Sequence, residues 1–252
     1  MPEIVSHYAK HKDVVALGEI FSSLLASYID DVEKYARNNS LLQIIRICIE
    51  VAFKEAGQRI KFANFGNTNY KSREVGEALR TLEKTFILNL VYPQTTYGLP
   101  LVYNYKKSPR LTVLDTGLLI YFSGLQSEYF QIEDLQDSSK GKIVEHIVGQ
   151  ELLAKNYLPL SKLHFWTRDK NNAAAELDFM ISYKSKIIPI EVKSGETGSL
   201  RSLHYYMNNT DTPLAIRLYA GKIVKQEVEI ANSKPYQLLN LPYFLAGKIE
   251  DY

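Results

Sequence analysis

Residues 175–193 carry the clearest structural pattern in the chain, and they read Ala175-Glu-Leu-Asp178-Phe-Met-Ile-Ser-Tyr-Lys184-Ser-Lys-Ile-Ile-Pro-Ile-Glu191-Val-Lys193. Apolar and polar side chains alternate in both halves of this stretch, and Ile, Val and Phe are frequent, which is typical of β-strands. A turn centred on Lys184 and Ser185 would fold the two halves into a hairpin. We therefore predict two antiparallel strands, over residues 174–183 and 186–193.

In that hairpin Asp178 would lie directly opposite Glu191. Lys193 would share a face of the sheet with Glu191, because side chains two residues apart on a strand point the same way. Opposed side chains are only about 4.5–5.5 Å apart at their Cβ atoms. Two carboxylates at that spacing repel each other unless a proton or a divalent cation lies between them. The pattern Asp-x12-Glu-x-Lys therefore predicts a metal site with a lysine beside it.

A solvated outer face is the alternative interpretation of these charges. Glu176 or Lys193 could simply pair across the hairpin, and composition alone favours that interpretation. Two observations favour the metal site. The first is that Met180, Ile187 and Pro189 would share the face of Asp178, so the acidic face is partly apolar.

The second observation is a third carboxylate upstream of the hairpin. Residues 141–156 read as a helix, and Gly141, Glu145, Val148 and Leu152 fall on one helical stripe. That stripe should pack on the sheet. Carboxylates are seldom buried without a partner, so we predict that Glu145 joins Asp178, Glu191 and Lys193 in one pocket able to hold a divalent ion.

The order of these segments resembles the PD-(D/E)XK nuclease-like (restriction-endonuclease-like) fold, which is arranged αβββαβ. The matching segments are residues 141–156, 163–168, 174–183, 186–193, 199–208 and 213–220. The resemblance implies that Asp178 and Glu191 hold Mg²⁺, with Mn²⁺ as a substitute, together with the backbone carbonyl of Val192. It also implies that Glu145 binds a second ion or orients a water, and that Lys193 assists the catalytic step.

A wider resemblance covers nearly the whole chain. Three segments are similar to prokaryotic AAA-type ATPases whose C-terminal half is a winged helix followed by a nuclease-like domain: Met1-Pro-Glu-Ile-Val5, Arg110-Leu-Thr-Val-Leu-Asp-Thr-Gly-Leu-Leu119 and Gly141-Lys-Ile-Val-Glu145. The sequence contains no Gly-x4-Gly-Lys-[Ser/Thr], the loop that cradles nucleotide phosphates. We therefore expect this chain to correspond to that C-terminal half. ATP would bind only in an ATPase module outside this sequence, and that module is an expected partner.

The resemblance and the apolar periodicity together predict an α+β or α/β fold in three parts. Residues 1–38 would be a helical segment that follows the ATPase module, residues 39–124 a winged-helix domain, and residues 125–252 the nuclease-like domain. Within the winged helix, helices at 41–56 and 72–85 would precede a strand at 86–92. A return strand at 101–105 would complete the hairpin of the wing.

Basic side chains near the second of these helices and beside the wing suggest contact with DNA, since Lys and Arg neutralise phosphates. They are Lys71, Arg73, Arg80, Lys84, Lys106, Lys107 and Arg110. Glu74, Glu77 and Glu83 lie on the same helix at spacings that favour internal ion pairs. Because the charge is mixed, docking of a protein partner stays open as an alternative to DNA.

The composition is that of an ordinary globular protein, with 46% hydrophobic and 23% charged residues among 252. The net charge of +2 is too small to indicate nucleic-acid binding without local clustering. No apolar run approaches the ~18 residues that span a bilayer, and the N-terminus lacks a secretory signal pattern. We expect a cytoplasmic protein with no membrane partner. The single cysteine, Cys48, excludes internal disulfides.

Two functions from different classes follow from the sequence. The chain is either a Mg²⁺-dependent DNA-processing module, or an interaction and regulatory half of an ATPase in which the nuclease-like fold serves for docking. All four acidic and basic site positions are present, which favours the first.

Overall fold

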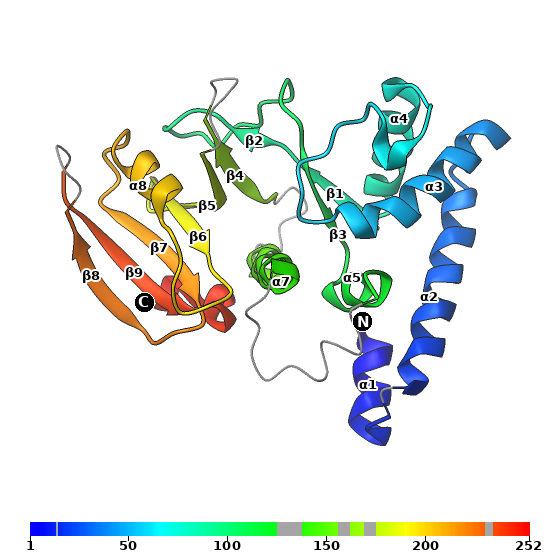
Figure 1. Cartoon of the computed structure of the whole chain (residues 1–252), viewed down its shortest axis with the longest axis horizontal. Coiled ribbons are helices and arrows are strands. Elements are labelled where there is room, and N and C mark those ends of the chain that lie inside the picture. Colours follow the sequence, from blue (N-terminus) through cyan, green and yellow to red (C-terminus); the bar gives the residue numbers. More distant parts are fainter. Residues whose placement is uncertain (14, 125–137, 156–161, 169–174, 230–233) are drawn as a thin grey trace. The chain divides into compact units, whose positions relative to one another are not determined.

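The computed structural model describes the chain except for residues 14, 125–137, 156–161, 169–174 and 230–233. Two compact units are present (Figure 1). The first comprises Met1–Leu90 and Pro109–Glu133, and the second comprises Val91–Ser108 and Asp134–Tyr252. The mixed α and β character predicted from the sequence is confirmed. The three-part division at residues 38 and 124 stays a prediction.

The first unit is mainly helical. Its elements are α1 (Pro2–His11), α2 (Val15–Glu33), α3 (Asn39–Glu55), η1 (Phe65–Asn67), α4 (Ser72–Lys84), β1 (Leu88–Val91), β3 (Arg110–Val113) and α5 (Thr116–Phe122). Helices α1 and α2 confirm the helical segment expected before residue 38. Helix α3 begins where Asn38 accepts a hydrogen bond from the amide of Leu41 at 2.8 Å, which satisfies one of the unpaired N–H groups of the first turn.

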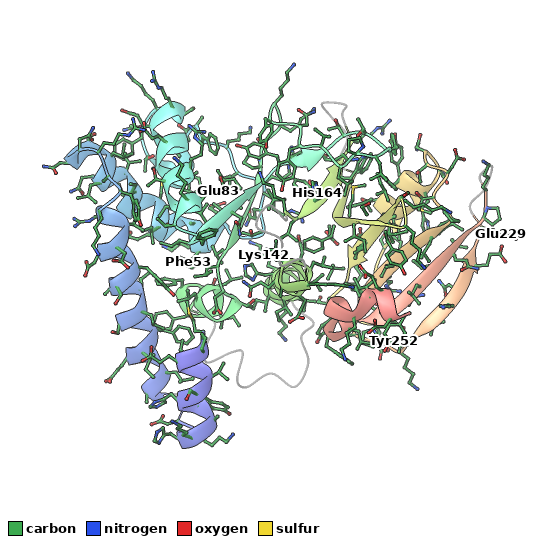
Figure 2. The ribbon with its side chains drawn as sticks, turned by 180° about the vertical axis from the view of Figure 1, so that it is seen from behind. Phe53, Glu83, Lys142, His164, Glu229 and Tyr252 are labelled. Atoms are coloured by element: carbon green, nitrogen blue, oxygen red, sulfur yellow. The ribbon has the colours of Figure 1, made fainter. Side chains whose placement is uncertain are left out.

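The core of the first unit follows from helical spacing. Helix α3 buries Ile45, Ile49 and Phe53 at intervals of four residues, and α4 buries a comparable stripe. The ring of Phe53, labelled in Figure 2, belongs to this core. It stacks on Phe122 with 4.3 Å between their centroids. Burial of each such side chain contributes about 1.5–3 kcal/mol. Helix α3 contacts α2, α4, α5, η1 and β3, and is therefore the central helix of this unit.

The strand pairing of the first unit differs from that of the predicted wing. Strand β1 pairs with β3 in a two-stranded sheet, whereas residues 101–105 form no strand, so the return strand predicted there is wrong. The intervening segment is held in the second unit instead. The amide of Asn104 donates to the carbonyl of Pro93 at 2.8 Å, and the hydroxyl of Tyr103 donates to the carbonyl of Leu163 at 2.6 Å.

The second unit contains the αβββαβ order expected from the sequence. Its elements are β2 (Pro93–Gln94), α7 (Ser138–Lys155), β4 (His164–Thr167), β5 (Glu176–Tyr183), β6 (Lys186–Val192), α8 (Arg201–Met207), β7 (Leu214–Tyr219), β8 (Val224–Val228), β9 (Tyr236–Pro242) and η2 (Tyr243–Asp251). All six predicted segments are confirmed as elements. The predicted ends at Asn156 and Ala174 lie outside the described residues.

A seven-stranded mixed sheet organises this unit, in the order β2-β4-β5-β6-β7-β9-β8. Its central strands β6 and β7 run parallel, and β5 and β6 form an antiparallel hairpin. Helix α7 and η2 lie on the same side of the sheet and contact each other (Figure 1). They cover a buried cluster that includes Val148, Phe179 and Ile190. Helix α8 belongs to a second cluster, which includes Leu203 and Ile187.

None of the helices in the described part of the chain is both long enough and apolar enough to cross a membrane.

Candidate functional site

The hairpin of β5 and β6 has the turn that the sequence predicts. Tyr183 pairs with Lys186, so the turn consists of Lys184 and Ser185, whose φ angles are 46° and 60°. Positive φ at both central residues is the geometry of the tight turns that match the twist of β-hairpins. The register continues to Phe179 opposite Ile190. The pairing of Asp178 with Glu191, one step beyond, stays a prediction.

A β-bulge at Asp178 determines the position of this residue, and no sequence pattern predicted it. His164 pairs with Met180 and Trp166 pairs with Leu177, so Asp178 and Phe179 together oppose the one residue between them on β4, Phe165. Bulges redirect side chains and are frequent beside functional sites. The bulge also changes the face of Leu177, which packs with Met180 and Ile187, whereas Phe179 packs in the other cluster.

Asp178 is fixed against the end of the neighbouring strand. Its Oδ2 accepts a hydrogen bond from the backbone amide of Val192 at 2.7 Å. Val192 is the last residue of β6. The carboxylate of Asp178 therefore lies beside the backbone that immediately follows Glu191.

Glu191 and Lys193 form an ion pair on the same strand end. Lys193 Nζ donates to Glu191 Oε1 at 2.7 Å, with side-chain exposures of 25% for Lys193 and 7% for Glu191. The second carboxylate oxygen, Oε2 of Glu191, is buried and has no hydrogen-bond partner among the described residues. A buried carboxylate oxygen without a partner is costly. This atom is a vacant acceptor in the site.

The electrostatic setting of Glu191 favours an added positive charge. Burial raises the pKa of the Glu191 carboxyl to about 8, and the negative charge of Asp178 is the next cause of the increase. Lys193 opposes this increase, and Glu145 adds to it. Two of the predicted carboxylates thus act electrostatically on the third, as expected for groups that share a site.

Glu145 lies on the stripe of α7 that faces the sheet. Gly141 and Gly149 stand one helical turn to either side of it. A Cβ placed at Gly149 would lie 3.2 Å from the ring of Phe179, and one placed at Gly141 would lie 3.9 Å from Ser194 Oγ. Val148 and Leu152, two residues of the predicted stripe, are buried in the cluster that α7 covers, so the predicted direction of the stripe is confirmed. However, no three His, Cys, Asp or Glu side chains among the described residues are placed to hold one metal ion, so Glu145 is near the site without completing a three-carboxylate cage.

Gly198 supports Lys193, a role that the sequence did not reveal. Its φ of +149° lies in the range that L-residues rarely adopt, and a Cβ there would lie 2.8 Å from Lys193 Cδ. The close approach allows the lysine stem to lie over the loop that precedes α8. The glycine in Ser194-Gly-Glu-Thr-Gly198 was visible in the sequence, but its contact with Lys193 was not.

The predicted DNA-binding residues divide between the two units. Lys71, Arg73, Arg80 and Lys84 are exposed on α4 and its N-cap in the first unit. Lys106 is exposed and Lys107 half-buried in the second unit. Arg110 is only 4% exposed, because β3 places it within the unit. The prediction that Arg110 contacts phosphate is therefore wrong.

The acidic residues of α4 have partners other than its lysines and arginines. Glu74 Oε2 accepts from the amide of Lys71 at 2.9 Å, and Glu83 Oε1 accepts from the amide of Leu90 at 2.9 Å. Glu77 lies 3.7 Å from a guanidinium nitrogen of Arg37. The ion pairs predicted within the helix are replaced by these contacts, and the basic side chains of α4 are exposed.

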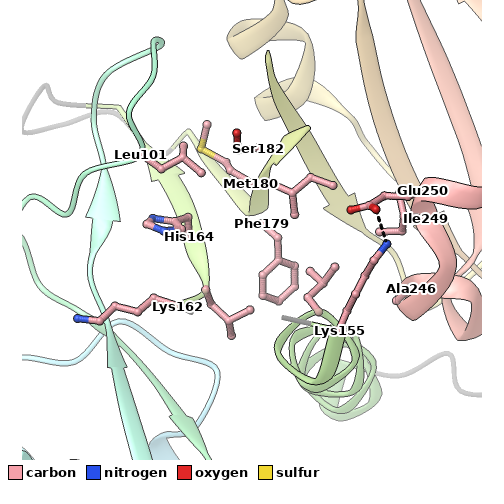
Figure 3. Close-up of a pocket in the computed structure, with 13 residues that line it drawn as sticks. Leu101, Lys155, Lys162, His164, Phe179, Met180, Ser182, Ala246, Ile249 and Glu250 are labelled. Atoms are coloured by element: carbon pink, nitrogen blue, oxygen red, sulfur yellow. Dashed lines mark ion pairs between the residues drawn. The ribbon is translucent and has the colours of Figure 1, made fainter. Parts of the chain in front are cut away.

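A hollow of about 290 Å³ lies elsewhere on β5, along residues 179–182 (Figure 3). Its wall includes the ion pair between Lys155 and Glu250, at 3.2 Å, and the half-buried His164. Burial lowers the pKa of His164, and the charge of Lys162 adds to this effect. None of the four predicted catalytic residues lines the hollow. The candidate functional site is therefore the cluster of Asp178, Glu191 and Lys193, and not this cavity.

The fold and site together define a mixed α+β protein with a buried, lysine-paired carboxylate cluster at the end of a central β-hairpin. The chain belongs to the family described as a domain of unknown function (DUF8612), whose model matches residues 1–129. A second family model, also described as a domain of unknown function (DUF4143), matches residues 140–243 and so spans the cluster. No curated protein matches the chain.

Proposed function

We propose that this protein processes nucleic acid by Mg²⁺-dependent hydrolysis of phosphodiester bonds. The observation that carries the proposal is the buried Glu191 carboxylate, which has one oxygen paired with Lys193 and the other without a partner, next to Asp178. Such a group favours a bound cation, because a cation would neutralise the charge that burial penalises.

The side chains fit a magnesium ion, which binds few protein ligands and retains several waters. Asp178 and Glu191 would hold it with the backbone carbonyl of Val192. When bound, the ion would polarise the scissile phosphate and lower the pKa of a coordinated water. Two carboxylates and one carbonyl suffice for this ion, so it does not require a third carboxylate among the described residues.

The remaining residues have roles suited to their positions. The ammonium of Lys193, held by Glu191, stabilises negative charge that develops on the phosphate and on the attacking oxygen. Glu145 tunes the charge of Glu191 from α7 and orients a water at the cluster. Asp178 keeps its position through the amide of Val192.

DNA contact by the first unit is part of the proposal. Helices α3 and α4 followed by the pair β1 and β3 have the order of a winged helix, with α4 as the recognition helix. The exposed Lys71, Arg73, Arg80 and Lys84 would contact phosphates, since the acids of α4 are engaged elsewhere.

We further propose that the protein works together with an AAA-type ATPase module. This part rests on the resemblance of the terminal and central segments to the C-terminal half of such ATPases. ATP would bind in that module, since this sequence contains no phosphate-binding loop of the Gly-x4-Gly-Lys type.

A docking function is the second candidate, and one observation favours it. Lys193 already pairs with Glu191, and no three potential ligands of the described residues are placed around one ion. A carboxylate cluster of that kind can be structural, with the fold retained to bind a protein partner or the ATPase module.

Nicking of supercoiled plasmid DNA distinguishes the two functions. The wild-type chain is incubated with Mg²⁺ or Mn²⁺, beside Asp178→Ala, Lys193→Ala and the control Glu196→Ala, which changes an exposed carboxylate of the adjoining loop. Hydrolysis predicts metal-dependent nicking that falls about 100-fold or more in the first two variants and persists in the control. Absence of nicking with either ion, together with binding of an ATPase module supplied in trans, would establish docking instead.

A further inference from the structure

Strand β8 forms an open edge of the sheet in the second unit. It pairs with β9 and stands last in the strand order (Figure 1). Residues 224–227 are exposed and Val228 is half-buried. In an edge strand, every second residue turns its backbone N–H and C=O away from the sheet. These groups can pair with a strand of another chain.

The sequence of β8 is complementary to itself when reversed. It reads Val224-Lys225-Gln226-Glu227-Val228. Two antiparallel copies centred on Gln226 would place Lys225 opposite Glu227 of the other copy, and Val224 opposite Val228, each contact occurring twice. Opposite charges directly across a strand pair stabilise it and like charges destabilise it. A second copy of this chain is therefore the partner that the pattern fits.

Apolar side chains at one end of β8 extend this surface. Ile223 is 48% exposed, Val224 is 43% exposed and Tyr252 is 45% exposed. Tyr252 is placed beside the strand because Lys225 Nζ donates to its backbone oxygen at 3.1 Å. Figure 2 shows Glu229 at the other end of β8, on the outer rim of the sheet. Exposed apolar side chains next to unpaired backbone groups are features of an interaction surface.

We propose that two copies of the protein associate through β8 in a two-fold symmetric, antiparallel pair that joins their two seven-stranded sheets. The same patch on both subunits meets itself, as two-fold symmetry requires. The short strand limits the paired surface, so the expected dimer is weak and depends on concentration. Charged residues on an edge strand can instead prevent pairing with other chains. If Lys225 and Glu227 act in that way, the protein is a monomer.

Charge exchange tests the pairing directly. Sedimentation equilibrium is measured over a range of concentrations for the wild type, Lys225→Glu, Glu227→Lys and the double variant. Each single change places like charges opposite each other twice, and should weaken association about tenfold. The double variant restores opposite charges and should regain association. A wild-type chain that stays monomeric throughout, or single variants that associate as strongly as the wild type, would overturn the proposal.

A cysteine at the symmetry axis tests the register. Cys48 is the native cysteine and is buried, so a new exposed thiol is the reactive one. Gln226→Cys would meet its own copy at a Cα separation compatible with a disulfide, about 4.4–6.8 Å. We expect this variant to form covalent dimers under mild oxidation faster than Glu50→Cys, an exposed control on α3. Equal rates of covalent dimer formation for the two variants would refute the register. Circular dichroism serves as the control that both variants are folded.

Discussion

Lys193 Nζ donates to Glu191 Oε1 at 2.7 Å, while Oε2 of the same carboxylate is buried without a hydrogen-bond partner among the described residues. Oε1 of Glu191 is thus paired with a positive charge from the same strand end. Oε2 can be satisfied only by a proton or by a cation from outside the described residues. This asymmetry determines how the site should respond to pH, to metal ions and to substitution.

Stability should fall as the pH rises through the pKa of Glu191. Burial and Asp178 raise this pKa from 4.5 to about 8, so between these values the folded state binds a proton that the unfolded state has lost. The stabilisation is present at low pH and is lost towards pH 8 and above. We expect the free energy of unfolding to decrease by on the order of 2–4 kcal/mol from pH 5 to 9 through this group.

Urea unfolding at several pH values, with Glu191→Gln beside the wild type, checks this expectation. The amide cannot ionise, so the variant should lose this part of the pH dependence and become the more stable protein at pH 9. Glu196→Gln, at an exposed position, should behave as the wild type. Identical pH profiles for the wild type and Glu191→Gln would contradict the assigned environment.

Divalent cations should stabilise the protein above pH 8. A cation bound to the folded state raises the melting temperature by mass action, and it replaces the proton at Glu191. We expect Mn²⁺ or Mg²⁺ to raise the Tm of the wild type in a thermal shift measurement, and to have little effect on Glu191→Gln or Asp178→Asn. A Tm increase of the same size in all three proteins would show that the ion does not bind at Glu191 and Asp178.

Gly198→Ala should disturb Lys193 without unfolding the protein. The added methyl group would lie 2.8 Å from Lys193 Cδ. The φ angle of residue 198 is +149°, which alanine rarely adopts. The lysine stem must move, so nicking should decrease about tenfold or more. Gly195→Ala is the matched control, since a Cβ there meets nothing within 4 Å. Equal activity of the two variants would show that Gly198 does not position Lys193.

The basic residues of α4 should control the salt dependence of DNA binding. Arg73→Ala and Lys84→Ala each remove an exposed charge, so the slope of log affinity against log salt should fall by roughly 1 for each lost phosphate contact. Arg110→Ala should instead reduce stability, because that side chain is buried. Fluorescence anisotropy at several salt concentrations measures the slope. Unchanged affinities for the α4 variants would favour protein docking over DNA contact.

Local patterns in the sequence were sufficient for much of the second unit. Alternation predicted β5 and β6, and the turn at Lys184 and Ser185 set the register that pairs Phe179 with Ile190. Helical spacing placed Glu145 on the sheet side of α7. These features depend on residues that are neighbours along the chain, or on the period of a single element.

Features that depend on distant segments were not predictable. The bulge at Asp178 arises from pairing with β4, and the contact of Gly198 with Lys193 arises from a loop conformation. The strand expected at residues 101–105 fails because Asn104 and Tyr103 find hydrogen-bond partners in the second unit. Burial of Arg110 follows from the pairing of β3, which overrides the usual preference of arginine for the surface.

Residues 91–108 belong to the second unit, whereas the segments on either side of them, up to Leu90 and from Pro109, belong to the first. A gene fragment that starts at residue 125 would therefore encode the sheet without β2, and would uncover the backbone of Phe165 and Trp166 with which that strand pairs. The two units therefore cannot be separated by a single cut of the polypeptide, even though each has its own packed interior.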